Sequence, residues 1–144
     1  MIQANELRVG NLVEANSPMM QVKEITEHTV GLYMPGSEAD SFFYDIEQIN
    51  PIPLSPEILE KFGFKEVFTK DWYSIRINDE SYLYSNPRDG FGLTIENKDE
   101  ETNTDIEELF IQLPHIKYLH QLQNLIFALC GEELPHTTTL LSQL

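Results

Sequence analysis

The stretch Asn50-Pro51-Ile52-Pro53-Leu54-Ser55-Pro56-Glu57 divides the chain into two parts with different hydrophobic patterns. Each proline disfavours the helical conformation in the residue before it, so residues 50–54 are expected to be extended. Ser55 is a good helix N-cap, and Pro56 stands at the first helical position, where its missing N–H costs nothing. We therefore expect a short strand to end and a helix to begin here, and we place a domain boundary between residues 54 and 55.

The first part, residues 1–54, has the pattern of short strands. Four segments rich in Val, Ile, Met and aromatic residues are separated by turn-forming residues, namely residues 10–14, 20–27, 29–33 and 41–44. In the second of these, Val22 and Ile25 break strict alternation, which indicates a β-bulge. A helical turn is expected at residues 45–49. Four short strands, a turn and a fifth extended segment are typical of an SH3-like small β-barrel.

The second part, residues 55–144, predicts a helix, an antiparallel sheet and a second helix. Gly63 is well placed to end the first helix in the left-handed conformation. Alternating apolar residues then indicate a meander of about four strands, at residues 72–77, 81–85, 91–96 and 109–113. In residues 118–130, leucine and isoleucine recur at intervals of three and four, which is typical of a helix with one apolar stripe. The predicted fold class is α+β, with a loosely ordered tail at residues 135–144.

The chain is strongly acidic throughout its length. Its 24 Asp and Glu residues outnumber 9 Lys and Arg, and the net charge of −15 divides into −6 for residues 1–55 and −9 for residues 56–144. Such a surface repels the phosphates of nucleic acids and the anionic face of a membrane, so we expect direct binding to neither. The simplest role of the charge is to keep the protein soluble. The alternative is recognition of a basic partner.

Three features predict a cytoplasmic location. The single cysteine, Cys130, cannot form an intrachain disulfide. The N-terminus lacks the basic region and apolar run of a signal peptide. The longest apolar run, residues 125–130, is far shorter than the roughly 20 residues that a membrane helix needs.

No motif for metal binding or catalysis is complete. Residues 99–108 resemble a calcium loop, but Thr104 stands where the loop needs glycine and Phe110 where it needs a bidentate glutamate. We therefore expect this acidic stretch to be a solvated hairpin loop between two strands. The histidines are His28, His115, His120 and His136. Their spacing does not place two ligands on one helical face, and one cysteine cannot supply a structural zinc site. Cys130 follows the negative end of a helix, which disfavours a thiolate, so we expect a buried structural thiol. We expect no cofactor and no catalytic residue.

The polar face of the last helix is unusual for so acidic a chain. It carries His120, Gln121, Gln123 and Asn124, and no acid occurs between Lys117 and Glu132. Uncharged amides on a helix indicate a covered face. Packing within the chain is the simpler interpretation, because most covered polar groups are satisfied inside the fold. The alternative is an interaction surface for a partner.

Aromatic residues on the predicted sheet form a second candidate site. Trp72, Tyr82 and Tyr84 fall on two neighbouring strands and could line a ligand pocket. Aromatic residues on adjacent strands are more often cross-strand pairs. Without basic residues between them, a platform for nucleic-acid bases is not expected.

Three segments resemble shared segments of one protein family. They are His120-Gln121-Leu122-Gln123-Asn124-Leu125 with the following Phe127-Ala128-Leu129 and Gly131-Glu132-Glu133-Leu134, the opening residues 5–11, and the central residues 51–61. The family consists of small uncharacterised proteins of gut-type bacteria, their phages and mobile elements. The resemblance touches both ends and the middle of the chain, and it implies no catalytic residue.

Three functional hypotheses follow. The first is a non-enzymatic module that binds a protein partner, which could be a second copy of the chain. The second is an acidic decoy that blocks a nucleic-acid-binding protein, as a mobile element could encode. The third is a small-ligand binder or an enzyme that uses the aromatic face of the sheet.

Overall fold

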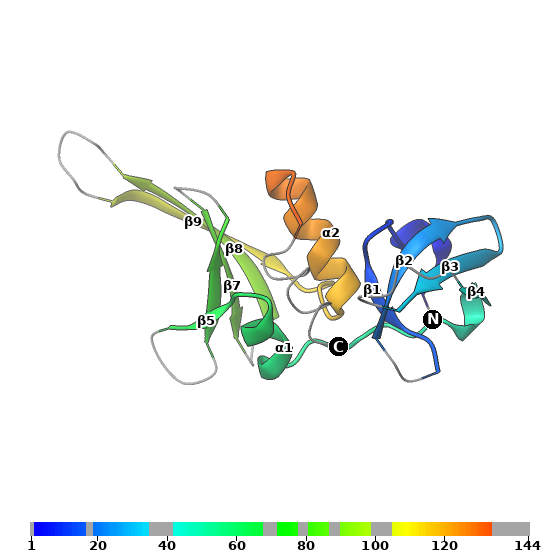
Figure 1. The fold of residues 1–144 in the computed structure, drawn as a ribbon. Helices are drawn as coiled ribbons and strands as arrows, with labels where there is room; N and C mark the ends of the chain where they lie inside the picture. The colour runs from blue at the N-terminus through cyan, green and yellow to red at the C-terminus, as the bar shows by residue number, and fades with distance from the viewer. Residues whose placement is uncertain are drawn as a thin grey trace.

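The computed structural model describes residues 2–16, 19–34, 42–67, 72–77, 81–86, 90–98 and 105–133, with side chains except at residues 94–98 and 105–110. The fold is α+β, with two antiparallel sheets and two α-helices. Helix α2 (Leu119–Cys130) lies between the two sheets (Figure 1). None of the helices within these ranges is long and apolar enough to cross a membrane. The expected turns at residues 35–37, 78–80 and 87–89, the loop at residues 99–104 and the tail at residues 135–144 lie outside the described residues.

The first sheet has four strands in sequence order. They are β1 (Leu12–Glu14), β2 (Met19–Ile25), β3 (Thr29–Tyr33) and β4 (Phe42–Asp45). The predicted bulge is confirmed between Val22 and Glu24. The expected helical turn at residues 45–49 is present as a 3₁₀ turn, Ile46–Gln48, and a second 3₁₀ turn, Ala4–Glu6, was not expected. Asn50 bridges Glu14 on the outer side of β1, but within the described ranges these strands do not close into a barrel.

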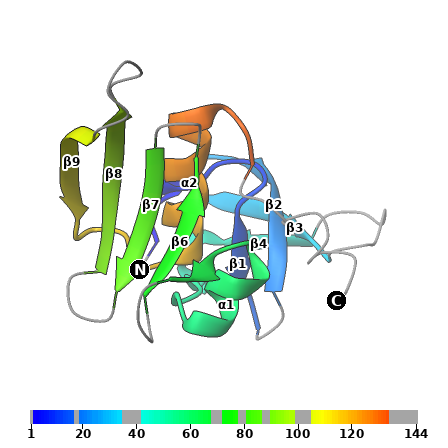
Figure 2. The same ribbon diagram turned by 90° about the vertical axis from the view of Figure 1, so that its left-hand side faces the viewer.

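The second sheet is a five-stranded meander instead of one with about four strands. Its strands are β5 (Lys65–Glu66), β6 (Tyr73–Arg76), β7 (Ser81–Asn86), β8 (Gly90–Lys98) and β9 (Asp105–Leu113). Figures 1 and 2 show that β8 and β9 run beyond the neighbouring strands as a long hairpin. Strand β9 begins at Asp105, so part of the acidic stretch expected to be loop continues the hairpin.

Helix α1 begins as its capping residue predicts, and a glycine lies just after each of the two helices. Helix α1 (Pro56–Lys61) starts after Ser55, whose Oγ accepts the Ile58 N–H at 3.3 Å. Gly63 and Gly131 follow the two helices with φ of +96° and +72°. Only glycine adopts this left-handed conformation without a steric penalty, which is why both helices end at these residues.

Two hydrophobic clusters form the interior, and they do not divide the chain at residue 54. One cluster joins the first sheet to the residues that flank it, among them Ile2, Leu7 and Ile49. The other joins the second sheet to both helices and also includes Leu12 of β1, which is fully buried. Residues 52–54 pair with residues 117–119, since Leu119 donates to the Ile52 carbonyl at 2.9 Å and Leu54 donates to the Lys117 carbonyl at 3.1 Å. We call the first sheet with its flanking residues the first unit, and the second sheet with α1 and α2 the second unit. The two units are joined through β1 and residues 52–54.

Candidate functional site

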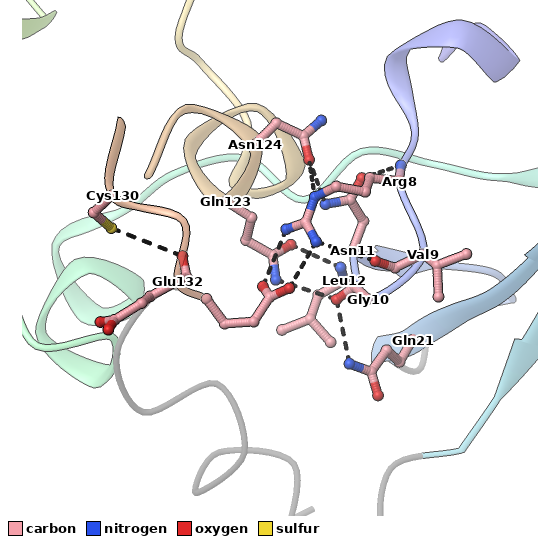
Figure 3. A network of polar contacts seen from close by, with 11 residues as sticks. Arg8, Val9, Gly10, Asn11, Leu12, Gln21, Gln123, Asn124, Cys130 and Glu132 are labelled. Atoms are coloured by element: carbon pink, nitrogen blue, oxygen red, sulfur yellow. Dashed lines mark hydrogen bonds and ion pairs between the residues drawn. The ribbon is translucent and has the colours of Figure 1, made fainter. Parts of the chain in front are cut away.

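The polar face of α2 lies against the chain's own N-terminal segment. Gln123 has no exposed surface, and its Oε1 accepts the Leu12 N–H at 2.8 Å. Its Nε2 donates to the Gly10 carbonyl at 3.4 Å. Figure 3 shows the amides of Gln123 and Asn124 extending from the helix toward residues 8–12. Gln123 thus satisfies a backbone donor at the start of β1 that would otherwise be buried without a partner.

Asn124 and Arg8 continue the junction between α2 and residues 8–12 toward the surface. The Asn124 Oδ1 accepts from Asn11 Nδ2 at 2.8 Å and from Arg8 Nε at 3.3 Å, while its Nδ2 donates to the Glu6 carbonyl at 2.9 Å. The Arg8 guanidinium donates to both carboxylate oxygens of Glu133, at 2.6 and 3.1 Å. The same guanidinium lies 4.2 Å from the centre of the Phe127 ring. These contacts fasten α2 to the residues that precede β1.

His120 is buried beside this network but does not take part in it. Its side chain is 1% exposed, and among the described residues neither ring nitrogen has a hydrogen-bond partner. The imidazole stacks on the Tyr118 ring, with 6.1 Å between the centroids and 14° between the planes. Burial lowers the pKa of His120 below its usual 6.5, and the Glu6 carboxylate partly opposes this shift. His120 is therefore a neutral core residue near pH 7.

Gln121 has a local role at the start of α2. Its Oε1 accepts the N–H groups of Lys117 at 2.9 Å and Tyr118 at 3.0 Å. Of the four residues considered as an interaction surface, His120 and Gln123 are buried, Asn124 is half-buried at the junction, and Gln121 caps the helix. Residues 6–12 of the same chain contact Gln123 and Asn124 on this face.

The aromatic residues of the second sheet are only partly brought together. Tyr82 and Tyr84 lie on one face of β7, with 6.1 Å between ring centroids. Tyr82 lines a cavity of about 330 Å³ together with Lys65 and Arg76, whose guanidinium carbon is 5.8 Å from the Tyr82 ring. Trp72 is half-buried just before β6. Two basic side chains therefore accompany Tyr82, although the sequence pattern suggested none.

The remaining candidates are the potential metal ligands and Cys130. Within the described ranges, no group of three or more potential metal ligands converges. Cys130 is exposed, so the expectation of a buried thiol is wrong. The last turn of α2 explains the difference, because its residues 127–130 are all exposed. The Cys130 thiol donates to the Ile126 carbonyl at 3.0 Å.

An exposed aromatic pair on β4 was not singled out from the sequence. Phe42 and Phe43 are 58% and 56% exposed. The signal was the run of three aromatic residues at positions 42–44, because side chains alternate along a strand and such a run cannot face one core. Comparisons of the chain with protein-family models, curated proteins and solved structures found no match.

Proposed function

We propose that this protein is a non-enzymatic interaction module that binds a basic, extended segment of a partner protein along β4. The observation that carries the proposal is the pair Phe42 and Phe43, two consecutive phenylalanines that are each more than half exposed. An edge strand with exposed apolar side chains is a template for pairing with an extended segment of another chain.

The two rings flank an edge of the first sheet. Strand β4 is last in the sheet order, and within the described ranges only β3 pairs with it. Phe42 stands opposite the buried Leu32, and Phe43 stands opposite Gly31. The two phenylalanines therefore lie on opposite faces of the sheet. An extended segment that adds to this edge would gain main-chain hydrogen bonds and a ring contact on each face.

Charge near this edge selects the kind of partner. Glu24 has its carboxylate beside the Phe43 ring, since both lie within 3.4 Å of the position that a Cβ on Gly31 would take. Asp45 is exposed at the end of β4. A segment with Lys or Arg among apolar residues complements this surface. A second copy of the chain is disfavoured, because each copy carries a net charge of −15.

The predicted SH3-like character of residues 1–54 is part of this proposal. Small barrels of that class often bind extended peptides at aromatic-lined surfaces. Four antiparallel strands in sequence order, followed by a 3₁₀ turn and an extended segment, support the assignment. Closure of these strands into a barrel stays a prediction.

The proposal is tested by selecting random peptides on the full chain and measuring their affinity for two variants. In the first, Phe42→Ser and Phe43→Ser are combined. In the control, Val9→Ser removes an apolar side chain that is also 56% exposed. Selected peptides are expected to contain Lys or Arg, and the double variant is expected to bind them about tenfold to a hundredfold more weakly, as is usual for central interface residues. The control is expected to bind like the unaltered chain.

Three results would count against it. Failure to enrich any peptide would exclude the docking edge. Equal binding by the double variant, combined with loss of binding at high salt, would favour the acidic decoy instead. A dimer in sedimentation that the double variant loses would make a second copy of the chain the partner.

A further inference from the structure

We infer that a cavity between the second sheet and α1 binds a small, mostly apolar carboxylate. The cavity has a volume of about 480 Å³. Sites for small molecules usually measure about 300–1,000 Å³ and combine apolar walls with a few polar groups. The site lies in the second unit, whereas the proposed docking edge lies on the first sheet, so the two proposals stand on different residues.

The cavity exists because small residues occupy positions that bulky ones would fill. On the inner face of the sheet, Ser85 of β7 lies directly between Tyr73 of β6 and Phe91 of β8. All three are buried and line the cavity. A serine between two aromatic rings leaves a slot in the layer of side chains. The next pair along the sheet joins Asn86 to Gly90, where a Cβ on the glycine would have no atom of the described part of the chain within 4 Å.

The opposite wall is apolar. It is formed by the start of α1 and by residues 116–117, with Leu54, Leu59 and Ile116 facing the slot. These segments are held in place by the hydrogen bond from Leu54 to the Lys117 carbonyl, at 3.1 Å. The Tyr73 hydroxyl donates to the Glu60 carboxylate of α1 at 3.5 Å, which ties the two walls together. A ligand body in this space would therefore contact mainly carbon atoms.

One charged group selects the class of ligand. Lys117 lines the cavity, and no carboxylate of the described residues lies within 4 Å of its ammonium group. Lys117 is exposed, and of the described residues that line the cavity it is the only charged one. The ammonium group favours a carboxylate on the ligand, and the Ser85 hydroxyl supplies a further hydrogen-bonding group on the sheet side. The apolar walls disfavour a ligand with several charges.

Nuclear magnetic resonance titrations of the full chain test this inference. The probes are octanoate and 1-naphthoate, with 1-octanol and 1-naphthalenemethanol as uncharged counterparts. At least one carboxylate is expected to bind saturably and to shift the amide signals of Ser85, Gly90 and Lys117. The matching alcohol is expected to bind more weakly.

Two variants and a control distinguish binding in the cavity from non-specific binding elsewhere on the protein. Lys117→Gln is expected to weaken carboxylate binding about threefold to tenfold and to leave alcohol binding unchanged. Lys61→Gln removes the same charge from an equally exposed residue of α1 that does not line the cavity, and it is expected to have no effect. Ser85→Leu fills the slot and is expected to abolish binding, with retained folding checked by circular dichroism. Absence of saturable binding, equal carboxylate affinity in Lys117→Gln, or shifts centred on Phe42 and Phe43 would each overturn the inference.

Discussion

Replacement of His120 by leucine is expected to stabilise the protein. A buried donor or acceptor without a partner costs about 1–3 kcal/mol, and both ring nitrogens of His120 are in this state among the described residues. The stack of His120 on Tyr118 stabilises the folded chain by about 0.5–1.5 kcal/mol. The two unpaired groups outweigh this stack, and leucine also favours the helix more than histidine does. We therefore expect His120→Leu to raise the free energy of unfolding by about 1–3 kcal/mol at pH 7.

The difference in free energy of unfolding between His120→Leu and the natural sequence should increase as the pH falls. Burial lowers the pKa of His120 in the folded chain, while an unfolded histidine titrates near 6.5. Below pH 6.5 the unfolded chain thus binds more protons than the folded chain, and the stability of the natural sequence falls as the pH drops. The slope from this group is at most about 1.4 kcal/mol per pH unit, and it levels off below the pKa of the folded state. The leucine variant lacks this contribution.

Urea unfolding between pH 5 and pH 8 measures both effects. Trp72, the single tryptophan, reports by fluorescence on the second unit, and circular dichroism reports on the whole chain. His28→Leu is the control, because the His28 side chain is 83% exposed. It should leave the free energy of unfolding at pH 7 unchanged. The reasoning is refuted if His120→Leu destabilises the protein at pH 7, or if it keeps the slope of the natural sequence below pH 6.5.

Three further substitutions test local contacts. Gln123→Leu leaves the buried Leu12 N–H without its acceptor and should lower the free energy of unfolding by about 1–3 kcal/mol. The control is Gln112→Leu, at an exposed position. Equal urea midpoints in the two variants would contradict this expectation. Ser55→Ala removes the N-cap of α1 and should cost about 0.5–2 kcal/mol, seen as faster hydrogen exchange at the start of the helix, and an unchanged rate would show that the cap is dispensable. A Cβ on Gly131 would meet no atom of the described residues within 4 Å, so the expected loss of about 1–2 kcal/mol in Gly131→Ala comes from the positive φ. An unchanged melting temperature would argue against that strain.

The elements that could be predicted are those whose signals are local. Ser55 and Pro56 determine the start of α1, and Gly63 and Gly131 determine where the two helices end. These residues act through their own backbone conformation and their nearest hydrogen bonds. The bulge in β2 was predictable for the same reason, because the apolar pattern itself changes phase there.

The features that could not be predicted depend on distant partners. Strand β5, Lys65–Glu66, is too short to show any period and exists because β6 pairs with it. The acidic start of β9 is a strand because β8 continues beside it, whereas its composition suggested a loop. The amides of α2 indicated a covered face, but nothing local identified Leu12 and Asn11 as their partners. The slot beside Ser85 depends on a register across three strands, which no single segment reveals.

The bond between Leu12 and Gln123 joins residues 111 positions apart, which has a consequence for how the protein is made. At about 5–20 residues per second, the ribosome needs roughly 6–20 s to add the residues between them. During that time β1 has emerged but lacks the helix that covers it, and its buried Leu12 and the Leu12 N–H remain open to other contacts. The first sheet is thus expected to mature late, when the last helix leaves the ribosome and closes over the first strand.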